Sequence, residues 1–286
     1  MQARTMGMGI WTGYIAASKT VGITRFGSID PKKLTQYGPY WGIFEWHPQP
    51  GAGPTEQRLY DAAKRDLANF SANGCRFLFP GWWHPEGKPD KTHTKTFPLP
   101  DSRFTEAMDG AYKALDRLRS DKTIGAIGFG VNEADTCVRF ARAGDFDVAM
   151  MAGRYSLLVQ TGLAEFLPLA LEKRIGVMLA GVFNSGILAT GAVPGAKYDY
   201  SPASPEVLDR VRRIEAVCAR HDTPIRRAAM QFAMAHPAVV SVVLGAVVPA
   251  EVRANVDEAE RPVPAALWAE LKAAGLLDAS APTPSA

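Results

Sequence analysis

Apolar residues follow two alternating patterns along the chain from about position 104 onward. Residues 104–119 carry apolar side chains at helical spacing, and 123–130 form a compact apolar run of strand length. The same pair of patterns then recurs towards the C-terminus. This alternation predicts a parallel sheet covered by helices, which is an α/β fold.

Further elements follow from the same periodicity. We predict strands at 147–152, 176–180 and 239–244, and helices at 135–143, 163–173, 204–220, 226–236, 249–257 and 265–274. The helix at 204–220 has the clearest start, because Ser204 is followed by Pro205 and Glu206, the residue types favoured at a helix N-terminus.

The first hundred residues have a weaker pattern. They predict a strand at 13–18, a helix at 55–73 and a buried strand at 75–79. The total is about six strands, whereas a (β/α)8 barrel needs eight. With no long internal linker, we expect one domain over 1–278 and a disordered tail over 279–286, where Pro, Ser and Ala predominate.

Composition excludes several classes of function. The 286 residues are 47% hydrophobic and 21% charged, with a formal charge of +3, and no basic run interleaved with aromatic residues indicates nucleic-acid binding. Three scattered cysteines fit neither a disulfide framework nor a metal site and favour a reducing compartment. We find no signal-peptide core and no membrane-length apolar run, and therefore expect a cytoplasmic protein without a membrane partner.

Five segments, in order, resemble the aldo-keto reductase superfamily. Residues 106–119 correspond to its fourth helix, 124–133 to its fifth strand and 152–158 to its sixth strand. Residues 182–191 correspond to the loop after the seventh strand, and 244–255 to the eighth strand with its cofactor helix. The Asn-Ser-Gly-Ile-Leu-Ala-Thr-Gly loop at 184–191 resembles most the bacterial branch of L-fucose dehydrogenase and D-threo-aldose 1-dehydrogenase. The resemblance implies a (β/α)8 TIM barrel that oxidises or reduces sugars or small aldehydes with NAD or NADP.

Upstream, the resemblance implies two catalytic residues. The segment 14–22 is similar to the third strand of the family, which makes Lys19 the catalytic lysine; otherwise Lys19 is an ordinary surface residue. The segment 60–67 resembles the third helix, and counting onward brings His84 to the position of the catalytic histidine. Because His84 lies beside two tryptophans, a plain loop position is the alternative.

The family mechanism needs a further pair of residues. In the family a tyrosine transfers the proton, and a lysine held by an aspartate lowers the pKa of that tyrosine. The Asp-Thr-Ala-x-x-Tyr-Gly-like segment that carries this pair does not occur before Lys19, and Tyr14, five positions away on a strand, faces the opposite side. We therefore expect a barrel that lacks the first two strand-helix units, through a missed start, a frameshift or a truncated gene.

The resemblance implies a better preserved cofactor half. Asn132 is expected to bind the nicotinamide carboxamide, with a turn-forming asparagine as the alternative, and Tyr155 to pack near the ring, with a structural tyrosine as the alternative. Glu251 is expected to accept a hydrogen bond from a ribose hydroxyl, so that NADP is not strongly preferred over NAD; otherwise it is a solvent-facing residue favoured by the helix dipole. The remaining candidates offer backbone groups and small side chains to the nucleotide: Phe183, Asn184, Ser185, Gly186, Leu188, Gly191, Gly245, Ala246 and Asn255. No metal site is expected.

Three hypotheses remain at this point. The chain is an NAD(P)-dependent oxidoreductase of aldoses or small aldehydes, an inactive homologue that binds the nucleotide, or the product of a damaged gene. Its expected partner is a small carbonyl compound or sugar, and the sequence does not predict an oligomeric state.

Overall fold

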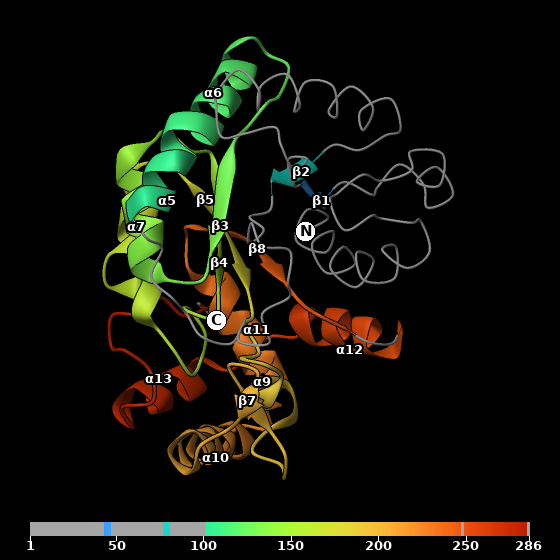
Figure 1. Ribbon diagram of the computed structural model, residues 1–286. Coiled ribbons are helices and arrows are strands. Elements are labelled where there is room, and N and C mark those ends of the chain that lie inside the picture. Colours follow the sequence, from blue (N-terminus) through green and yellow to red (C-terminus); the bar gives the residue numbers. More distant parts are fainter. Residues whose placement is uncertain (1–42, 47–76, 81–100, 247–248, 285–286) are drawn as a thin grey trace.

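Four apolar runs form a parallel sheet with the order β3–β4–β5–β8 (Figure 1). The computed structural model describes residues 43–46, 77–80, 101–246 and 249–284, so the elements predicted at 13–18 and 55–73 lie outside the described residues. The strands of this sheet are β3 (Gly128–Val131), β4 (Val148–Ala152), β5 (Gly176–Ala180) and β8 (Val239–Val243). A separate parallel pair joins β1 (Ile43–Trp46) to β2 (Phe77–Pro80), which overlaps the strand predicted at 75–79.

The alternation of side chains along β4 and β5 produces the centre of the core. Ala149 and Met151 on β4 are buried and stand in register with Val177 and Leu179 on β5, which are buried as well. The residues between them are half-buried. This period of two places one continuous apolar face against the covering helices.

One α-helix lies between each pair of neighbours among the first three strands of the sheet, as the sequence pattern predicts. The helix α7 lies between β3 and β4, beside the sheet in Figure 1, and α8 lies between β4 and β5, after the short 3-10 helix η3 (Thr161–Leu163), and contacts β5. The helices that the sequence predicted after β3 are α7 (Ala134–Ala143), α8 (Phe166–Glu172), α10 (Pro205–Arg220), α11 (Ile225–Ala235), α12 (Pro249–Glu260) and α13 (Ala265–Ala273). All six predictions are confirmed, with ends that differ by a few residues.

The start of α10 has the predicted capping chemistry. The Ser204 hydroxyl accepts a hydrogen bond from the Val207 N–H at 3.4 Å, and Pro205 occupies the first helical turn. A side-chain oxygen at this position satisfies one of the N–H groups that a helix start leaves without an acceptor.

The helix expected at 104–119 is divided into three segments. They are α5 (Asp101–Glu106), the π-helix η2 (Ala107–Tyr112) and α6 (Lys113–Ser120). Gly110, which has low helix propensity, lies in the widened turn. The following strand is shorter than the predicted run at 123–130, because Lys122 has a left-handed φ of 63° and Thr123 donates back to the Leu118 carbonyl, so the chain turns before β3 begins.

Two small elements after β5 were not predicted. They are the one-turn helix α9 (Ile187–Thr190) and a hairpin of β6 (Lys197–Tyr198) and β7 (Ser201–Pro202). The two turn residues, Asp199 and Tyr200, have φ values of 46° and 62°. Left-handed angles at both positions are typical of a type I′ turn, whose usual Asn-Gly sequence is absent here.

The described end of the chain is ordered against the core, in contrast to the disordered tail expected from its composition. Ala281 is only 1% exposed and belongs to the main core cluster. The Asp278 carboxylate accepts hydrogen bonds from the Ser280 N–H and hydroxyl, at 2.8 and 2.6 Å, which forms the turn that directs Ala281 inward. Local hydrogen bonds and one buried methyl group thus outweigh the polar composition over 279–284.

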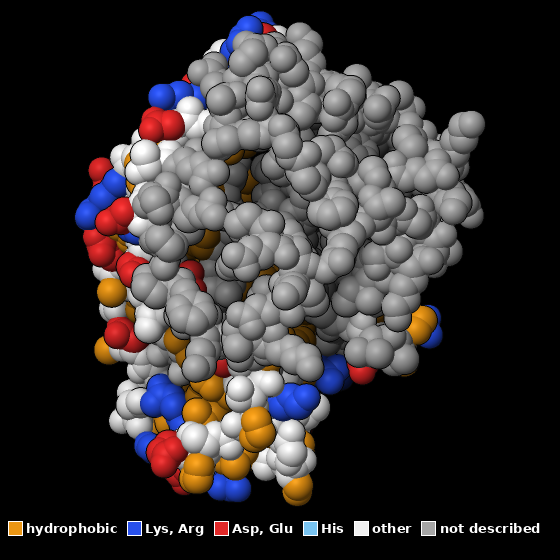
Figure 2. All heavy atoms as spheres, viewed as in Figure 1, with side chains coloured by type: hydrophobic (Ala, Val, Ile, Leu, Met, Phe, Trp, Pro, Cys, Tyr) orange, Lys and Arg blue, Asp and Glu red, His pale blue; other side chains and the backbone are white. Residues whose placement is uncertain are grey.

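The described surface mixes charges of both signs. Figure 2 shows Lys, Arg, Asp and Glu side chains interspersed along the left edge of the molecule. Arg119 of α6 pairs with Asp147 at 2.8 Å, and Asp147 also accepts the Ile127 N–H at 2.7 Å, so these contacts fix α6 to the sheet. Within the described ranges, no helix is long and apolar enough to cross a membrane.

Candidate active site

The carboxyl ends of the four parallel strands lie at one edge of the sheet, and most described candidates follow them directly. Asn132 is exposed immediately after β3, the loop 183–191 comes after β5, and Gly245 comes after β8. In parallel α/β folds this edge is where ligands bind, because the loops that follow neighbouring strands meet there. The structure therefore brings these three candidates to a common edge.

The loop 183–191 has an unusual backbone at its start. Asn184, Ser185 and Gly186 have successive left-handed φ values of 45°, 61° and 99°. Strained backbone of this kind persists where surrounding contacts fix it, and it occurs often at ligand sites. Gly186 also has open space around it, because no atom lies within 4 Å of where a β-carbon would stand.

Asn184 holds this loop to the loop after β4. Its side chain is 3% exposed, its Oδ1 accepts a hydrogen bond from the Ser156 hydroxyl at 2.5 Å, and its Nδ2 donates to the Gly153 carbonyl at 3.5 Å. The Asn184 amide is thus occupied by the protein itself. Its contribution is to position the loop, while direct contact of its side chain with a nucleotide is not supported.

Most backbone N–H groups of the loop are also occupied. Those of Asn184, Gly186 and 188–191 donate to carbonyls within the segment 181–187. Among the described residues, the N–H groups of Phe183, Ser185 and Ile187 have no backbone acceptor. Ser185 and Ile187 flank the left-handed Gly186, so their N–H groups are the candidates for an anionic ligand such as a pyrophosphate.

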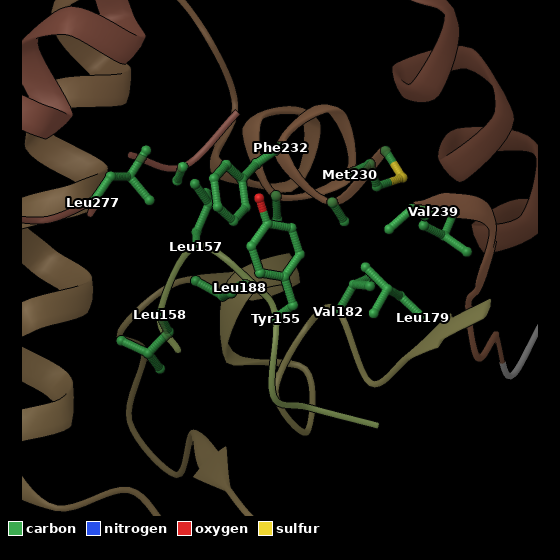
Figure 3. Packing of buried hydrophobic residues seen from close by; sticks show 14 of the residues in the cluster. Tyr155, Leu157, Leu158, Leu179, Val182, Leu188, Met230, Phe232, Val239 and Leu277 are labelled. Carbon is green, nitrogen blue, oxygen red and sulfur yellow. The ribbon is translucent and has the colours of Figure 1, made fainter. Parts of the chain in front are cut away.

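Tyr155 lies in the hydrophobic core, which corrects the expectation that it approaches the nicotinamide. Figure 3 shows its ring among Leu157, Leu188 and Phe232, and the ring centroids of Tyr155 and Phe232 are 4.8 Å apart. It is 0% exposed, burial raises the pKa of its phenol, and its hydroxyl has no partner among the described residues. The chain turns towards the core after Gly153, so Tyr155 does not lie at the sheet edge although it follows the end of β4 by only three residues.

Two further loop candidates are packing residues in this structure. The Leu188 side chain is 0% exposed within the same core, and Gly191 is buried beneath α10. The buried Leu188 side chain cannot contact a ligand, and Gly191 has no side chain to do so. Both residues therefore contribute by shaping the loop. Phe183, by contrast, is half-buried at the edge of the core and retains some exposed surface.

The candidates after β8 also include both accessible and buried residues. Gly245 is exposed with open space around it, and Glu251 is half-buried in the first turn of α12. Ala246 is buried, and Asn255 is 3% exposed, with its Oδ1 accepting from Arg226 of α11 at 3.4 Å. Asn255 therefore connects α12 to α11.

A pocket of about 530 Å³ opens beside the carboxyl ends of β3 and β4. Its lining includes four acidic residues and one basic residue, namely Glu133, Asp135, Glu165, Asp199 and Arg154. The Arg154 guanidinium lies 3.8 Å from the Asp199 carboxylate, which connects the pocket to the hairpin. The sequence pattern did not single out these residues; the signal for Arg154 is its position directly after the β4 edge.

The expected acid-base residues Lys19 and His84 lie outside the described residues. In the described part of the chain, no group of three or more His, Cys, Asp or Glu side chains is placed to hold a metal ion. The buried thiols of Cys137 and Cys218 are free, and burial raises the pKa of Cys218 to about 12, so they act as packing groups.

A model of the Aldo/keto reductase family matches residues 49–275, most of the chain. The chain belongs to this family. Among solved structures, an aldo-keto reductase of Bacillus halodurans in its holo form matches with a TM-score of 0.55 at 20% identity, over 80% of this chain and 69% of that one. The fold is therefore the (β/α)8 barrel of the family, in which β3, β4, β5 and β8 are neighbouring strands.

Curated relatives of this aldo-keto reductase include three named oxidoreductases. A D-threo-aldose 1-dehydrogenase of Pseudomonas sp is 40% identical over 62% of this chain and 53% of its own length. A pyridoxal 4-dehydrogenase of Microbacterium luteolum is 39% identical over 59% and 49%, and an NADH-specific methylglyoxal reductase of Escherichia coli is 27% identical over 50% and 46%. The chain thus spans about half the length of these relatives.

Proposed function

We propose that this family member is an NAD(P)-dependent oxidoreductase that acts on aldose sugars or small aldehydes. The observation that carries the proposal is the strand edge that holds Asn132, the loop 183–191 and Gly245 together, in a chain of this family. The relatives named above act on an aldose, on pyridoxal and on methylglyoxal, all of which are carbonyl compounds or their hemiacetals.

The described residues fit a nicotinamide nucleotide. The N–H groups of Ser185 and Ile187, which have no backbone acceptor among the described residues, suit a pyrophosphate, and the open positions at Gly186 and Gly245 let a ligand approach the backbone closely. Asn132, exposed at the end of β3, would hold the nicotinamide carboxamide. When bound, the nucleotide supplies the hydride donor or acceptor of the reaction.

The acid-base part of the proposal concerns Lys19 and His84. Removing hydride from a sugar hemiacetal, or adding it to a carbonyl, requires proton transfer at the oxygen and polar groups around it. His84 would orient the oxygen, and the Lys19 ammonium would lower the pKa of a proton-transfer group beside it. The loss of a general acid-base group typically costs roughly 10² to 10⁴ in rate.

The pocket beside β3 and β4 supports a polar, uncharged substrate. Two of its four carboxylates are paired, Glu165 with Arg142 at 2.5 Å and Asp199 with Arg154 at 3.8 Å, and the remaining excess of carboxylates disfavours a phosphate ester. A free aldose or a small hydroxylated aldehyde fits this lining.

An alternative is a nucleotide-binding homologue without turnover. Calorimetric titration with NAD and NADP, run beside turnover assays on L-fucose, D-arabinose, pyridoxal and methylglyoxal, separates the two. Turnover that Lys19→Met and His84→Ala abolish supports the enzyme and its site. Nucleotide binding without turnover supports the alternative, turnover that survives both substitutions refutes the site assignment, and absence of nucleotide binding refutes both functions.

A further inference from the structure

We propose that Glu215 is a positioning residue that holds the loop 183–191 in the conformation that binds the nucleotide. The inference rests on the proposed function, since it assigns the loop to the nucleotide. Glu215 lies on α10, outside every segment from which the family resemblance predicts a cofactor contact.

The contact between Glu215 and the loop is direct. The Oε2 atom of Glu215 accepts a hydrogen bond from the Ala192 N–H at 3.2 Å, at the residue that follows the loop. The carboxylate is half-buried, and a carboxylate that accepts a backbone N–H bond is a stronger acceptor than a neutral group.

Gly191 makes this contact possible. A β-carbon at Gly191 would collide with Oε1 of Glu215 and would stand 2.8 Å from its carboxyl carbon. The backbone of Gly191 also has φ 84° and ψ −171°, a region that is essentially restricted to glycine. The glycine thus lets the chain pass directly beneath the carboxylate.

The loop is therefore fixed at both ends by different elements. At its start, Asn184 connects it to Ser156 and to the Gly153 carbonyl beside β4. At its end, Gly191 donates to the Ile187 carbonyl at 2.8 Å and Glu215 fixes Ala192 to α10.

Between these anchors lie Ser185 and Ile187, whose N–H groups have no backbone acceptor in the described part of the chain. They belong to a segment that contains three successive left-handed residues. Loss of the Glu215 anchor would let the end of the loop move and would reduce the time during which both groups face the ligand. The carboxylate thereby contributes to nucleotide affinity through the protein backbone.

The test compares Glu215→Ala, which removes the acceptor, with Glu215→Gln, which retains an acceptor oxygen of nearly the same shape. Asp209→Ala is the control, because Asp209 is an exposed acid on the same helix. Amide hydrogen exchange over 184–192 reports the loop without nucleotide, calorimetry gives Kd for NAD and NADP, and thermal unfolding gives Tm. Glu215→Asp, one methylene shorter, serves if Glu215→Ala does not fold.

We expect Glu215→Ala to accelerate exchange over 184–192 and to weaken nucleotide binding about tenfold, the range for a hydrogen bond to a charged group. Glu215→Gln should fall between Glu215→Ala and the unaltered chain, because its neutral oxygen is a weaker acceptor, and Asp209→Ala should stay within about twofold of the unaltered chain. A lower Tm for Glu215→Ala with unchanged Kd and unchanged loop exchange overturns the inference. If the unaltered chain binds neither nucleotide, the proposed function falls, and the exchange rates alone decide whether Glu215 holds the loop.

Discussion

Single residues in this protein are constrained by their neighbours as much as by their own chemistry, and Gly191 is the clearest case. We predict that Gly191→Ala destabilises the fold by about 2–4 kcal/mol, because it adds backbone strain and displaces the Glu215 carboxylate. Urea unfolding measures the change. Gly125→Ala is the control, since no atom lies within 4 Å of its β-carbon position, and its effect should stay within about 0.5 kcal/mol.

Glu251 carries the prediction on nucleotide preference. The residue is half-buried in the first turn of α12, where a carboxylate would repel a 2′-phosphate and accept a hydrogen bond from a free ribose hydroxyl. We expect the chain to show no strong preference for NADP, and Glu251→Arg to shift the ratio of the two Kd values towards NADP by about tenfold.

A control and a contrary result complete this prediction. Glu260→Arg makes the same change of charge at an exposed position at the other end of α12 and should leave the ratio unchanged. NADP binding at least about tenfold tighter than NAD by the unaltered chain, a difference of about 1.4 kcal/mol, contradicts the role of Glu251.

Residue positions were predictable from sequence where a strand end fixes them. Asn132 and Gly245 lie at the predicted edge, because each follows a strand that the apolar pattern identified. Tyr155 was misplaced because the path of the chain beyond Gly153 depends on packing against Phe232, which is distant in sequence. The role of Glu215 could not be predicted from sequence, because acidic residues are common on helix surfaces and only the structure shows that this one contacts the end of the loop 183–191.

Elements were predictable to the degree that a repeating pattern defines them. The amphipathic stripes identified helices such as α7 and α11, because burial of one face sets a period of 3.6 residues. The one-turn α9 and the two-residue strands β6 and β7 are too short for any period to appear. The turn between β6 and β7 is held by residues far from it in sequence, because the Ser185 hydroxyl accepts the Tyr200 N–H at 2.9 Å and Arg154 pairs with Asp199.

The hairpin that contains β6 and β7 yields a prediction at the scale of the element. Tyr200 adopts a left-handed φ of 62° while its side chain is 74% exposed, so little burial offsets the strain. Tyr200→Gly should stabilise the protein by about 0.5–1 kcal/mol, the relief of strain less the entropy that glycine loses on folding. Chemical denaturation measures the gain.

Tyr200→Phe is the matched variant for this prediction. It retains both the left-handed backbone and the exposed ring, and its stability should equal that of the unaltered chain. Equal stability of Tyr200→Gly and Tyr200→Phe would contradict the prediction, because it would mean that the relief of strain does not exceed the entropy that glycine loses on folding.

The stability of the whole molecule should depend on pH through His236. This side chain is 4% exposed, its Nδ1 accepts the Ala238 N–H at 3.1 Å, and burial lowers its pKa. The unfolded chain then binds this proton more readily than the folded chain, so the free energy of unfolding decreases as pH falls below the ordinary histidine value of about 6.5. Above that pH both states are neutral at this site and its contribution is constant.

Urea unfolding at pH 7.5 and pH 5.5 tests this dependence. His236→Asn retains an oxygen that can accept the Ala238 N–H but does not titrate, so its loss of stability between the two pH values should be smaller than that of the unaltered chain. An identical loss in the two proteins would exclude His236 as a source of the dependence.

The order of strands in the sheet also affects the order in which they pair during folding. The strands β3, β4 and β5 pair with their neighbours in sequence across single helices, so this part can assemble from nearby contacts. The partner of β5 on its other side, β8, is synthesised only after the hairpin, α10 and α11. Pairing of β5 with β8 must overcome the entropy of closing the long loop between them, so we expect β8 to dock late in folding. Until it does, the unpaired edge of β5 is open to incorrect pairing with other strands.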